Sequence, residues 1–272
     1  MSILKGKTIF MTGGSRGIGE AIAIRCGADG ANVVIAAKTT EPHPRLPGTI
    51  YTAAEKVEAA GGQALPVKVD IRDEDNVQSA IDQAVDRFGG IDIVINNASA
   101  IMLTGTLATP MKRFDLMHQV NTRGTFMVSK LALPYLLESD HPHILNISPP
   151  LNLAPHWFGN HVAYTMAKYG MSMCVLGMAH EFADQGVGVN ALWPKTAIAT
   201  SAVKNVIGES LIERSRNCDI MSDAAHVILT RDPKATTGNF FVDEDILREE
   251  GVTDFEKYAI KPGVELAPDF FL

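Results

Sequence analysis

A glycine-rich turn close to the start of the chain restricts the possible folds more than any other feature. The segment Thr12-Gly13-Gly14-Ser15-Arg16-Gly17-Ile18-Gly19 follows an apolar run at residues 8–11 and precedes a helical pattern at residues 20–29. Glycines let the backbone turn tightly, and the first turn of the next helix offers unpaired N–H groups and the positive end of its dipole. Strand, glycine turn and helix in this order predict a dinucleotide pyrophosphate site, although three glycines alone also fit an ordinary turn.

Strand-like and helix-like segments alternate along the rest of the chain. Short apolar runs, separated by helical patterns, occur at residues 31–37, 64–69, 91–95, 143–147, 187–193 and 238–243. This alternation predicts an α/β fold of the Rossmann type: a doubly wound parallel sheet of about seven strands, with its ligand at the carboxyl edge. We expect one dinucleotide-binding and catalytic domain at residues 1–243. The aromatic-rich extension at 244–272 is expected to pack on that domain or at a subunit interface.

Charge and cysteine usage disfavour several other classes of protein. The 272 residues carry a formal net charge of -7, which argues against a general nucleic-acid or anionic-membrane surface. No apolar run approaches the roughly 20 residues that span a bilayer, and because the glycine turn begins at Thr12 we expect no signal sequence before it. Cys26, Cys174 and Cys218 are widely spaced, so we expect neither disulfides nor a metal site, and a reducing, cytoplasmic compartment.

A candidate catalytic pair lies in the second half of the chain. Tyr164 and Lys168 are four residues apart on a predicted helix and therefore share one face. Tyr-x-x-x-Lys is common by chance and usually indicates surface packing, but here Ser148 precedes it at the end of a predicted strand. Asn121 interrupts an otherwise good helical pattern, where its side chain competes for backbone hydrogen bonds.

Together these motifs resemble the short-chain dehydrogenase/reductase family. The glycine spacing is similar to that family's T-G-x-x-x-G-x-G, and Asn96-Asn97-Ala98-Ser99 resembles its Asn-Asn-Ala-Gly, with serine in place of glycine. Within the family, residues 41–48, residues 147–153, Trp193-Pro194-Lys195-Thr196 and the Pro-Asp-Phe-Phe ending resemble the hydroxysteroid-dehydrogenase-like subgroup. Animal members of that subgroup carry a sterol-carrier domain, which we do not expect in these residues.

The resemblance implies a role for each matching residue. Tyr164 would be the acid/base and Ser148 would orient the carbonyl oxygen. Lys168 would tune Tyr164 and bind the ribose, while Asn121 would hold a proton-relay water. Asp70 would bond the adenine amino group, with a turn cap as its alternative role.

Further cofactor contacts implied by the resemblance lie on two other strand ends. They are Asn97 and Ala98 after one strand, and Pro194 and Thr196 after another. Lys195 replaces the family's glycine and one residue is added, so Thr200 is an alternative to Thr196 for binding the nicotinamide carboxamide.

Local charge favours NADP(H) over NAD(H). NAD-binding units usually place an acid about 20 residues beyond the glycines, but residues 36–40 contain none. Arg16 and Lys38 are positioned to meet a 2′-phosphate, although two solvated surface cations are the alternative. Glu41 is the nearest acid, and the proline-rich loop around it leaves its direction open.

The sequence therefore predicts NADP-dependent hydride transfer to or from a carbonyl or secondary alcohol on an apolar, including lipid-like, small molecule. A non-catalytic NADP-binding scaffold or redox sensor is the main alternative. An enoyl reductase is less favoured because related enzymes space Tyr and Lys more widely. Long helices at residues 124–137 and 162–182, apolar on more than one face, predict a homodimer or homotetramer. Helical stretches at residues 202–216 and 219–230 are expected to form a lid over substrate.

Overall fold

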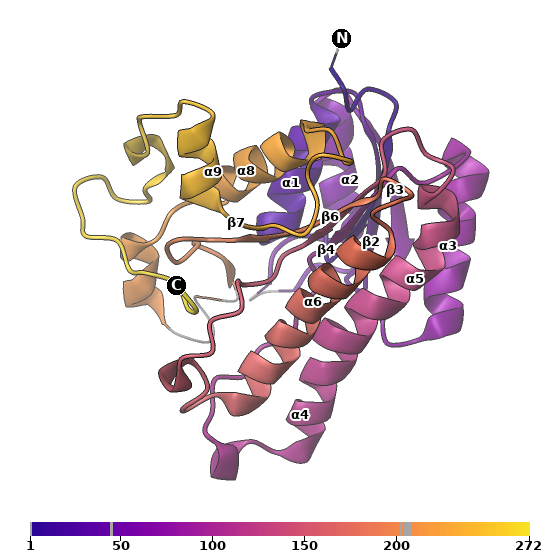
Figure 1. Cartoon of the computed structure of the whole chain (residues 1–272). Helices are drawn as coiled ribbons and strands as arrows, with labels where there is room; N and C mark the ends of the chain where they lie inside the picture. The colour runs from indigo at the N-terminus through magenta and orange to yellow at the C-terminus, as the bar shows by residue number, and fades with distance from the viewer. Residues whose placement is uncertain (1, 44–45, 202, 204–207) are drawn as a thin grey trace.

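The computed structural model describes residues 2–43, 46–201, 203 and 208–272, and its centre is a parallel sheet (Figure 1). Seven strands are present in these residues, in the order β3-β2-β1-β4-β5-β6-β7. This arrangement confirms the predicted doubly wound parallel sheet. The strands are β1 (Thr8–Thr12), β2 (Asn32–Ala37), β3 (Gln63–Lys68), β4 (Ile93–Asn96), β5 (His143–Asn146), β6 (Gly188–Trp193) and β7 (Phe240–Val242).

The strand order reverses at β1, which places the ligand-binding crevice of such folds at the end of this strand. At that end Thr12 pairs with Ala36 of β2 on one side and with Asn96 of β4 on the other. The Thr12 hydroxyl donates to the Ile95 carbonyl at 3.2 Å and accepts the Asn97 N–H at 3.0 Å. The carboxyl ends of β1 and β4 are thus tied together where the crevice opens.

Helices cover both faces of the sheet (Figure 1). On one face lie α1 (Gly17–Gly27), α2 (Ile50–Ala59), α8 (Asp219–Thr230) and α9 (Asp243–Glu249). On the other lie α3 (Glu74–Phe88), α5 (Gly124–Leu136) and α6 (Val162–Glu181), with α4 (Met111–Met117) leading into α5. Among the described helices, none has both the length and the apolar character to cross a membrane.

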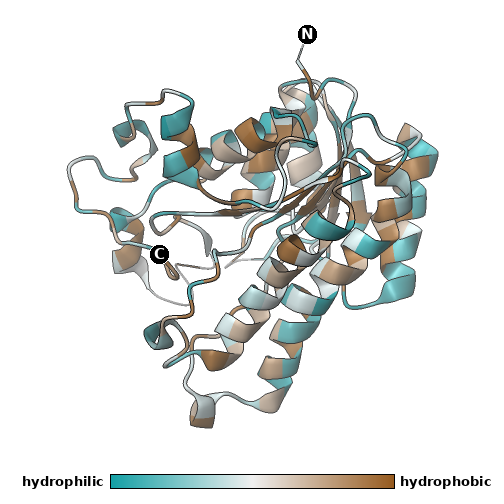
Figure 2. Ribbon diagram, viewed as in Figure 1, coloured by the Kyte–Doolittle hydropathy of each residue, from teal (hydrophilic) through white to brown (hydrophobic). Residues whose placement is uncertain are grey.

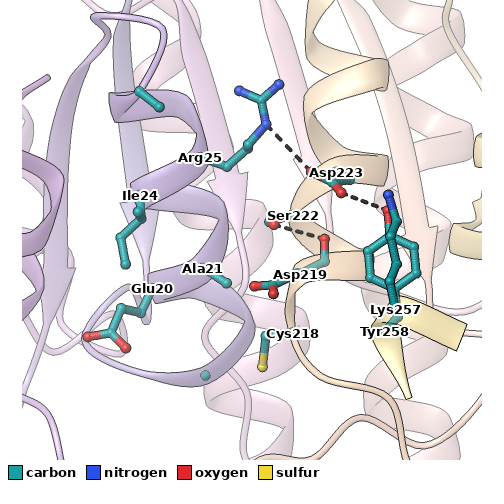
Figure 3. Close-up of a pocket in the computed structure, with 12 residues that line it drawn as sticks. Glu20, Ala21, Ile24, Arg25, Cys218, Asp219, Ser222, Asp223, Lys257 and Tyr258 are labelled. Atoms are coloured by element: carbon teal, nitrogen blue, oxygen red, sulfur yellow. Dashed lines mark hydrogen bonds and ion pairs between the residues drawn. The ribbon is translucent and has the colours of Figure 1, made fainter. Parts of the chain in front are cut away.

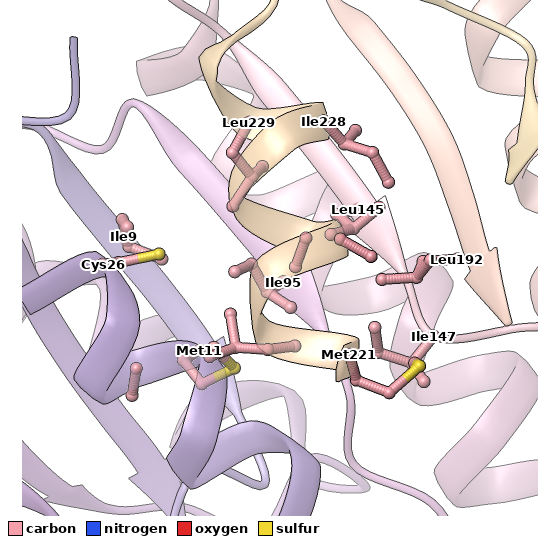
Figure 4. Close-up of a cluster of buried hydrophobic side chains, with 14 of the residues drawn as sticks. Ile9, Met11, Cys26, Ile95, Leu145, Ile147, Leu192, Met221, Ile228 and Leu229 are labelled. Atoms are coloured by element: carbon pink, nitrogen blue, oxygen red, sulfur yellow. The ribbon is translucent and has the colours of Figure 1, made fainter. Parts of the chain in front are cut away.

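Each face of the sheet carries its own apolar layer. Figure 2 shows that the strands are hydrophobic along most of their length, as a parallel sheet covered on both sides requires. On the α8 side, Met221, Ile228 and Leu229 belong to the same buried cluster as Ile95 and Leu145 of the strands (Figure 4). This packing makes α8 part of the core, so the predicted role of residues 219–230 as a lid is wrong.

The helical segment that contains Asn121 is distorted. A π-helical turn, η2 (His118–Arg123), separates α4 from α5. Asn121 is fully buried in this turn, and its side chain donates to the Ala100 carbonyl at 2.9 Å and accepts the Ala100 N–H at 2.7 Å. A π turn is a common way to insert a side chain into a helix without breaking it.

Two predicted loop features fall partly outside the described residues. The helix expected over 202–216 includes residues 202 and 204–207, which lie outside them; in its described part Val203 is α-helical and Glu209–Arg214 form the 3₁₀ helix η4. Residues 44–45 of the proline-rich loop also lie outside them. Three other short 3₁₀ turns in the described chain are η1 (Thr106–Ala108), η3 (Pro155–Trp157) and η5 (Glu256–Tyr258).

After α9 the chain returns to the carboxyl edge of the sheet. We call residues 267–271 the returning segment. The Ala267 carbonyl accepts the Ala197 N–H at 2.9 Å, and the Asp269 N–H donates to the Lys195 carbonyl at 3.1 Å. The returning segment therefore runs beside the loop that follows β6.

Candidate active site

A cavity of about 560 Å³ opens at the carboxyl edge of the sheet. Its lining brings together most of the residues that the sequence motifs single out. Only Gly19, Asn121, Ser148 and Thr196 of the predicted site residues are not part of this lining. The predicted residues that line it are Gly13, Ser15, Arg16, Gly17, Ile18, Lys38, Asp70, Asn97, Ala98, Tyr164, Lys168 and Pro194.

The glycine turn presents backbone N–H groups at the start of α1. Gly13 and Gly17 have φ values of +68° and +59°, which side-chain-bearing residues rarely adopt. Arg16 is the N-cap of α1 but makes no side-chain capping bond, so the first-turn N–H groups keep their capacity to bind an anion.

Gly19 has a packing role instead of a lining role. A Cβ at this position would lie 2.4 Å from Asn97 Nδ2 and 2.7 Å from the Gly13 carbonyl oxygen. Asn97 Nδ2 donates to the carbonyls of Thr12 at 3.1 Å and Gly13 at 3.0 Å. The Asn97 side chain thus holds the glycine turn through its two carbonyls, and the absence of a side chain at Gly19 leaves room for the Asn97 amide.

Arg16 and Lys38 both line the cavity, but each has a protein partner. The Arg16 guanidinium donates to the Pro47 carbonyl at 3.2 Å and to the Gly48 carbonyl at 3.0 Å. Lys38 Nζ lies 3.5 Å from Asp70 Oδ2 and is largely exposed. Glu41 is exposed and is not part of the cavity lining.

Asp70 is held chiefly by a residue that the sequence motifs did not indicate. Arg72 Nη2 donates to Asp70 Oδ2 at 2.5 Å, and Arg72 Nε donates to Oδ1 at 2.9 Å. The hydrogen bonds from Arg72 hold the pKa of Asp70 well below its usual range. The carboxylate is therefore ionised and largely compensated by its neighbour.

Tyr164 lies on α6 with its side chain almost completely buried. Burial, with a further contribution from the Asp269 charge, raises the pKa of the Tyr164 phenol above its usual value. The phenol is therefore protonated and can act as a proton donor. No hydrogen bond to its hydroxyl occurs from any residue that the structure describes.

Lys168 lies one turn after Tyr164 and is anchored to the strand end. Its Nζ donates to the Ile147 carbonyl at 2.7 Å and lies 5.0 Å from the centroid of the Trp193 ring. Burial lowers the pKa of Lys168 to about 7, although the Asp269 charge opposes this shift. The ammonium is bonded to Ile147 and not to the phenol of Tyr164.

Ser148, immediately after β5, is fully buried and its hydroxyl has no hydrogen-bond partner in the described structure. Such an unpaired buried hydroxyl costs free energy until a ligand atom satisfies it. It is well suited to bond an oxygen placed between β5 and α6.

The loop after β6 is tied to α9 through Lys195. The Lys195 N–H donates to Asp243 Oδ1 at 2.9 Å, and Lys195 Nζ lies 2.7 Å from Asp245 Oδ1 and 3.3 Å from Glu244 Oε1. Lysine in place of the family's glycine thus pairs with acids of α9 and does not line the cavity. Thr196 is buried and its hydroxyl has no partner among the described residues.

The returning segment contributes cavity residues that the motifs did not predict. Asp269 and Phe270 line the cavity, and Phe271 is fully buried in a ring cluster. The Phe271 ring lies 5.9 Å from that of Trp193 and 6.4 Å from that of Tyr164, centroid to centroid. The sequence signals were the Pro-Asp-Phe-Phe ending and the number of aromatic residues near the end of the chain, and neither has a spacing that relates it to Tyr164.

A second hollow of about 650 Å³ lies between α1 and α8 (Figure 3). Of the predicted site residues, only Gly17 borders it. Several of its polar groups are paired with one another: Asp223 Oδ2 accepts the Tyr258 hydroxyl at 2.7 Å, and Asp223 Oδ1 lies 3.5 Å from Arg25 Nε. The cavity at the carboxyl edge is therefore the candidate active site.

Known proteins are similar to this chain in sequence and in fold. A family model for short chain dehydrogenases matches residues 7–209. Hydroxysteroid dehydrogenase-like protein 2 of Danio rerio is 62% identical over 269 residues, which is 99% of this chain but 64% of the relative. The chain thus spans less than two thirds of that relative's length.

Two solved structures extend the comparison. A crystal structure of a dehydrogenase candidate from Xanthomonas campestris is 54% identical, with a TM-score of 0.96 that covers 100% of this chain and 99% of the other. A metagenomic short-chain oxidoreductase in complex with NADP shares the fold at 24% identity, with a TM-score of 0.73 over 88% of this chain and 97% of the other.

Proposed function

The chain belongs to the short-chain dehydrogenase family, and from this premise we propose that it is an NADP-dependent oxidoreductase. The family membership, and the relatives named for the hydroxysteroid-dehydrogenase-like subgroup, confirm the resemblance predicted from the motifs. The proposed reaction is hydride transfer between nicotinamide and a carbonyl or secondary alcohol of an apolar, including lipid-like, small molecule.

One observation carries this proposal. The phosphate-binding glycine turn and the Tyr164–Lys168 pair line the same cavity, although they lie far apart in the sequence. Beside them lies the buried Ser148 hydroxyl, which lacks a partner in the described residues. A scaffold that only binds the nucleotide would need the glycine turn. It would not need Tyr164, Lys168 and an unpaired Ser148 hydroxyl beside them.

The residues fit a nicotinamide dinucleotide. Backbone N–H groups at Gly13 to Ile18 and the start of α1 would hold the pyrophosphate. Asp70, Asn97 and Ala98 would border the adenosine and ribose, and the Pro194 to Thr196 loop would border the nicotinamide. When bound, the reduced cofactor supplies a hydride.

The protein's own residues would supply the proton chemistry. Ser148 donates a hydrogen bond to the substrate carbonyl oxygen and holds it beside Tyr164. The Tyr164 phenol gives its proton to the oxygen as negative charge develops there. Lys168, four residues along the same helix, offsets the charge left on Tyr164. Asn121, whose side chain is bonded to the Ala100 backbone, would support the proton relay. Each unit by which the Lys168 ammonium lowers the pKa of the Tyr164 phenol corresponds to about 1.36 kcal/mol of preferential stabilisation of the phenolate.

The preference for NADP(H) is supported by local charge. Lys38 is exposed and lies at the long distance of 3.5 Å from Asp70, whose charge is already compensated by Arg72. A 2′-phosphate could therefore recruit Lys38 at little cost. Arg16 reaches the same cavity, and Glu41 does not line it.

The proposal includes a division of the chain and a setting for it. Residues 1–243 form the dinucleotide-binding and catalytic domain, and residues 244–272 extend it. The three cysteines are free thiols, which fits a reducing, cytoplasmic compartment.

We further propose a homodimer or homotetramer formed through α5 and α6. Both helices expose large apolar side chains: Phe126 on α5, and Met166, Met173 and Leu176 on α6. Light scattering at micromolar concentration is expected to show an oligomer, and a monomer would contradict this assignment.

The decisive experiment is a turnover screen. Purified protein with NADPH, and with NADP⁺ in the reverse direction, is followed by nicotinamide absorbance against ketones, aldehydes and alcohols that include lipid-like compounds. We expect turnover of an apolar member of this panel. Tight nucleotide binding without turnover of any member would favour the scaffold or redox sensor.

A further inference from the structure

The returning segment forms one wall of the cavity that contains Tyr164 and Lys168. Asp269 and Phe270 are both part of its lining. The segment is fixed there, because the Trp193 indole N–H donates to the Phe270 carbonyl at 2.9 Å and the Asp269 N–H donates to the Lys195 carbonyl at 3.1 Å. The buried Phe271 ring anchors its end.

Asp269 is the acid on this wall, and half of its carboxylate has no protein partner. Its Oδ1 accepts the N–H of Phe270 at 2.7 Å, and no described residue donates to Oδ2. Two groups of α6 face it, Tyr164 and Lys168, and Asp243 faces it from the start of α9. The Lys168 ammonium is already bonded to the Ile147 carbonyl, and Asp243 adds negative charge.

Apolar side chains line the cavity beside Tyr164. They include Ile101, Leu116 and Val120 and the aromatic rings of Trp193 and Phe270. The cations Arg16 and Lys38 belong to the glycine-turn end. A ligand that reaches Tyr164 therefore meets apolar side chains, the rings of Trp193 and Phe270, and the Asp269 carboxylate, which makes no ion pair with any described residue.

We propose that Asp269 and Phe270 are specificity-determining residues that restrict the substrate to uncharged apolar carbonyl compounds and exclude those with a carboxylate close to the reacting carbon. This inference rests on the proposed function for the location of the reacting carbon, next to Tyr164. The physical basis is repulsion between two like charges, which a partly buried and largely apolar site screens less than bulk water does. Phe270 provides the apolar surface that the uncharged body of the substrate covers.

The test uses two ligands that differ in charge and hardly in shape, 4-acetylbenzamide and 4-acetylbenzoate. Their dissociation constants are measured by calorimetry with protein saturated with NADP⁺, which cannot reduce a ketone, so turnover is not required. We expect the amide to bind at least about tenfold more tightly than the carboxylate. In Asp269→Asn the ratio should fall to within about threefold, because asparagine keeps the oxygen that accepts the Phe270 N–H but removes the charge.

Glu265→Gln is the matched control. It removes one negative charge from an exposed residue close to the returning segment, so its ratio should equal that of the parent protein. A second readout needs no variant. Burial raises the pKa of Asp269 to about 7, so the preference for the amide should grow from about pH 6 to about pH 8. The probe carboxylate, with a pKa of about 4, stays ionised throughout.

Three outcomes would overturn the proposal. They are equal affinity of the parent protein for both probes, absence of binding by either, and an unchanged ratio in Asp269→Asn. A large loss of NADP⁺ affinity in this variant with no change in the ratio would place Asp269 at the cofactor instead. Failure of the turnover screen with the affinity ratio intact would refute the proposed function and leave the selectivity of the wall standing.

Discussion

The two ends of the cavity are built in different ways. The glycine-turn end uses backbone N–H groups and consecutive residues of one strand-turn-helix unit, closed by Asn97. The Tyr164 end uses side chains from the segment after β5, from α6, from the loop after β6 and from the returning segment, and Ser148, Tyr164 and Lys168 among them are buried. Binding an invariant pyrophosphate requires only backbone, whereas proton transfer requires side chains whose pKa values the surroundings can shift.

The largest expected effect changes turnover, which depends on the Tyr164 end, and leaves nucleotide binding nearly unchanged. Tyr164→Phe removes the transferable proton but keeps the buried ring, so turnover should fall by about 10²–10⁴-fold. NADP(H) affinity should stay within about threefold, since the phenylalanine ring packs as the tyrosine ring does and the pyrophosphate contacts are at the other end. Steady-state kinetics and calorimetry measure the two quantities. More than a tenth of the parent activity in this variant would contradict the assignment.

The next effect acts on the glycine-turn end. Gly19→Ala places a methyl group 2.4 Å from Asn97 Nδ2, which cannot move without losing its bonds to the turn. We expect the free energy of unfolding to fall by about 1–3 kcal/mol, with at least about tenfold weaker nucleotide binding.

Gly177→Ala on α6 is the control for Gly19→Ala, because a Cβ there meets nothing within 4 Å. Alanine in a helix interior should raise the free energy of unfolding by about 0.5–1 kcal/mol. Chemical denaturation distinguishes the two variants. Equal stability of both would show that the close approach at Gly19 relaxes freely.

A third prediction concerns the cations of the glycine-turn end. A charge-assisted hydrogen bond is worth roughly 1.5–3 kcal/mol, so the parent protein should prefer NADP⁺ to NAD⁺ by about tenfold to a hundredfold. Arg16→Ala combined with Lys38→Asp should reverse the preference. Calorimetry at low salt gives both dissociation constants, and equal constants in the parent would refute the assignment.

The smallest effect is a pH dependence that couples the two ends. Burial raises the pKa of Asp269 to about 7 and lowers the pKa of Lys168 to about 7. From about pH 6 to about pH 8 the first gains a negative charge and the second loses a positive one, so affinity for anionic NADPH should fall by about threefold to tenfold.

Asp269→Asn isolates the contribution of Asp269 to this pH dependence. The 2′-phosphate of the cofactor titrates at about pH 6 whether it meets the parent protein or the variant. Only the part of the pH dependence that comes from Asp269 should be lost in the variant. Identical pH profiles for the parent and the variant would show that Asp269 does not titrate in this range.

The glycine-turn end could be predicted from sequence because its signals are local. The turn between β1 and α1 is one continuous segment, and the strands of a buried parallel sheet are apolar runs that periodicity detects. Asn121 within an otherwise good helical pattern was also a local signal. In the structure this residue lies in the π turn between α4 and α5.

The Tyr164 end could be predicted only in part, because its remaining contacts join residues far apart in sequence. Nothing near Lys195 indicates that Asp245 will neutralise it, and no spacing relates Asp269 to Lys168. The lid role of α8 was wrong for a related reason. An amphipathic pattern shows that a helix has an apolar face but does not identify the surface that covers it.

The aromatic cluster around Phe271 also determines the optical properties of the molecule. The chain has two tryptophans, Trp157 and Trp193, and both rings lie within 6 Å of the Phe271 ring, at 5.7 Å and 5.9 Å between centroids. Trp193 lies beneath the Lys168 ammonium, and its indole N–H holds the returning segment. Intrinsic ultraviolet emission excited through indole therefore originates at the Tyr164 end alone. A stopped-flow measurement of this emission would follow the rate of substrate entry without an attached dye. The glycine turn contains no tryptophan and would not contribute to the signal.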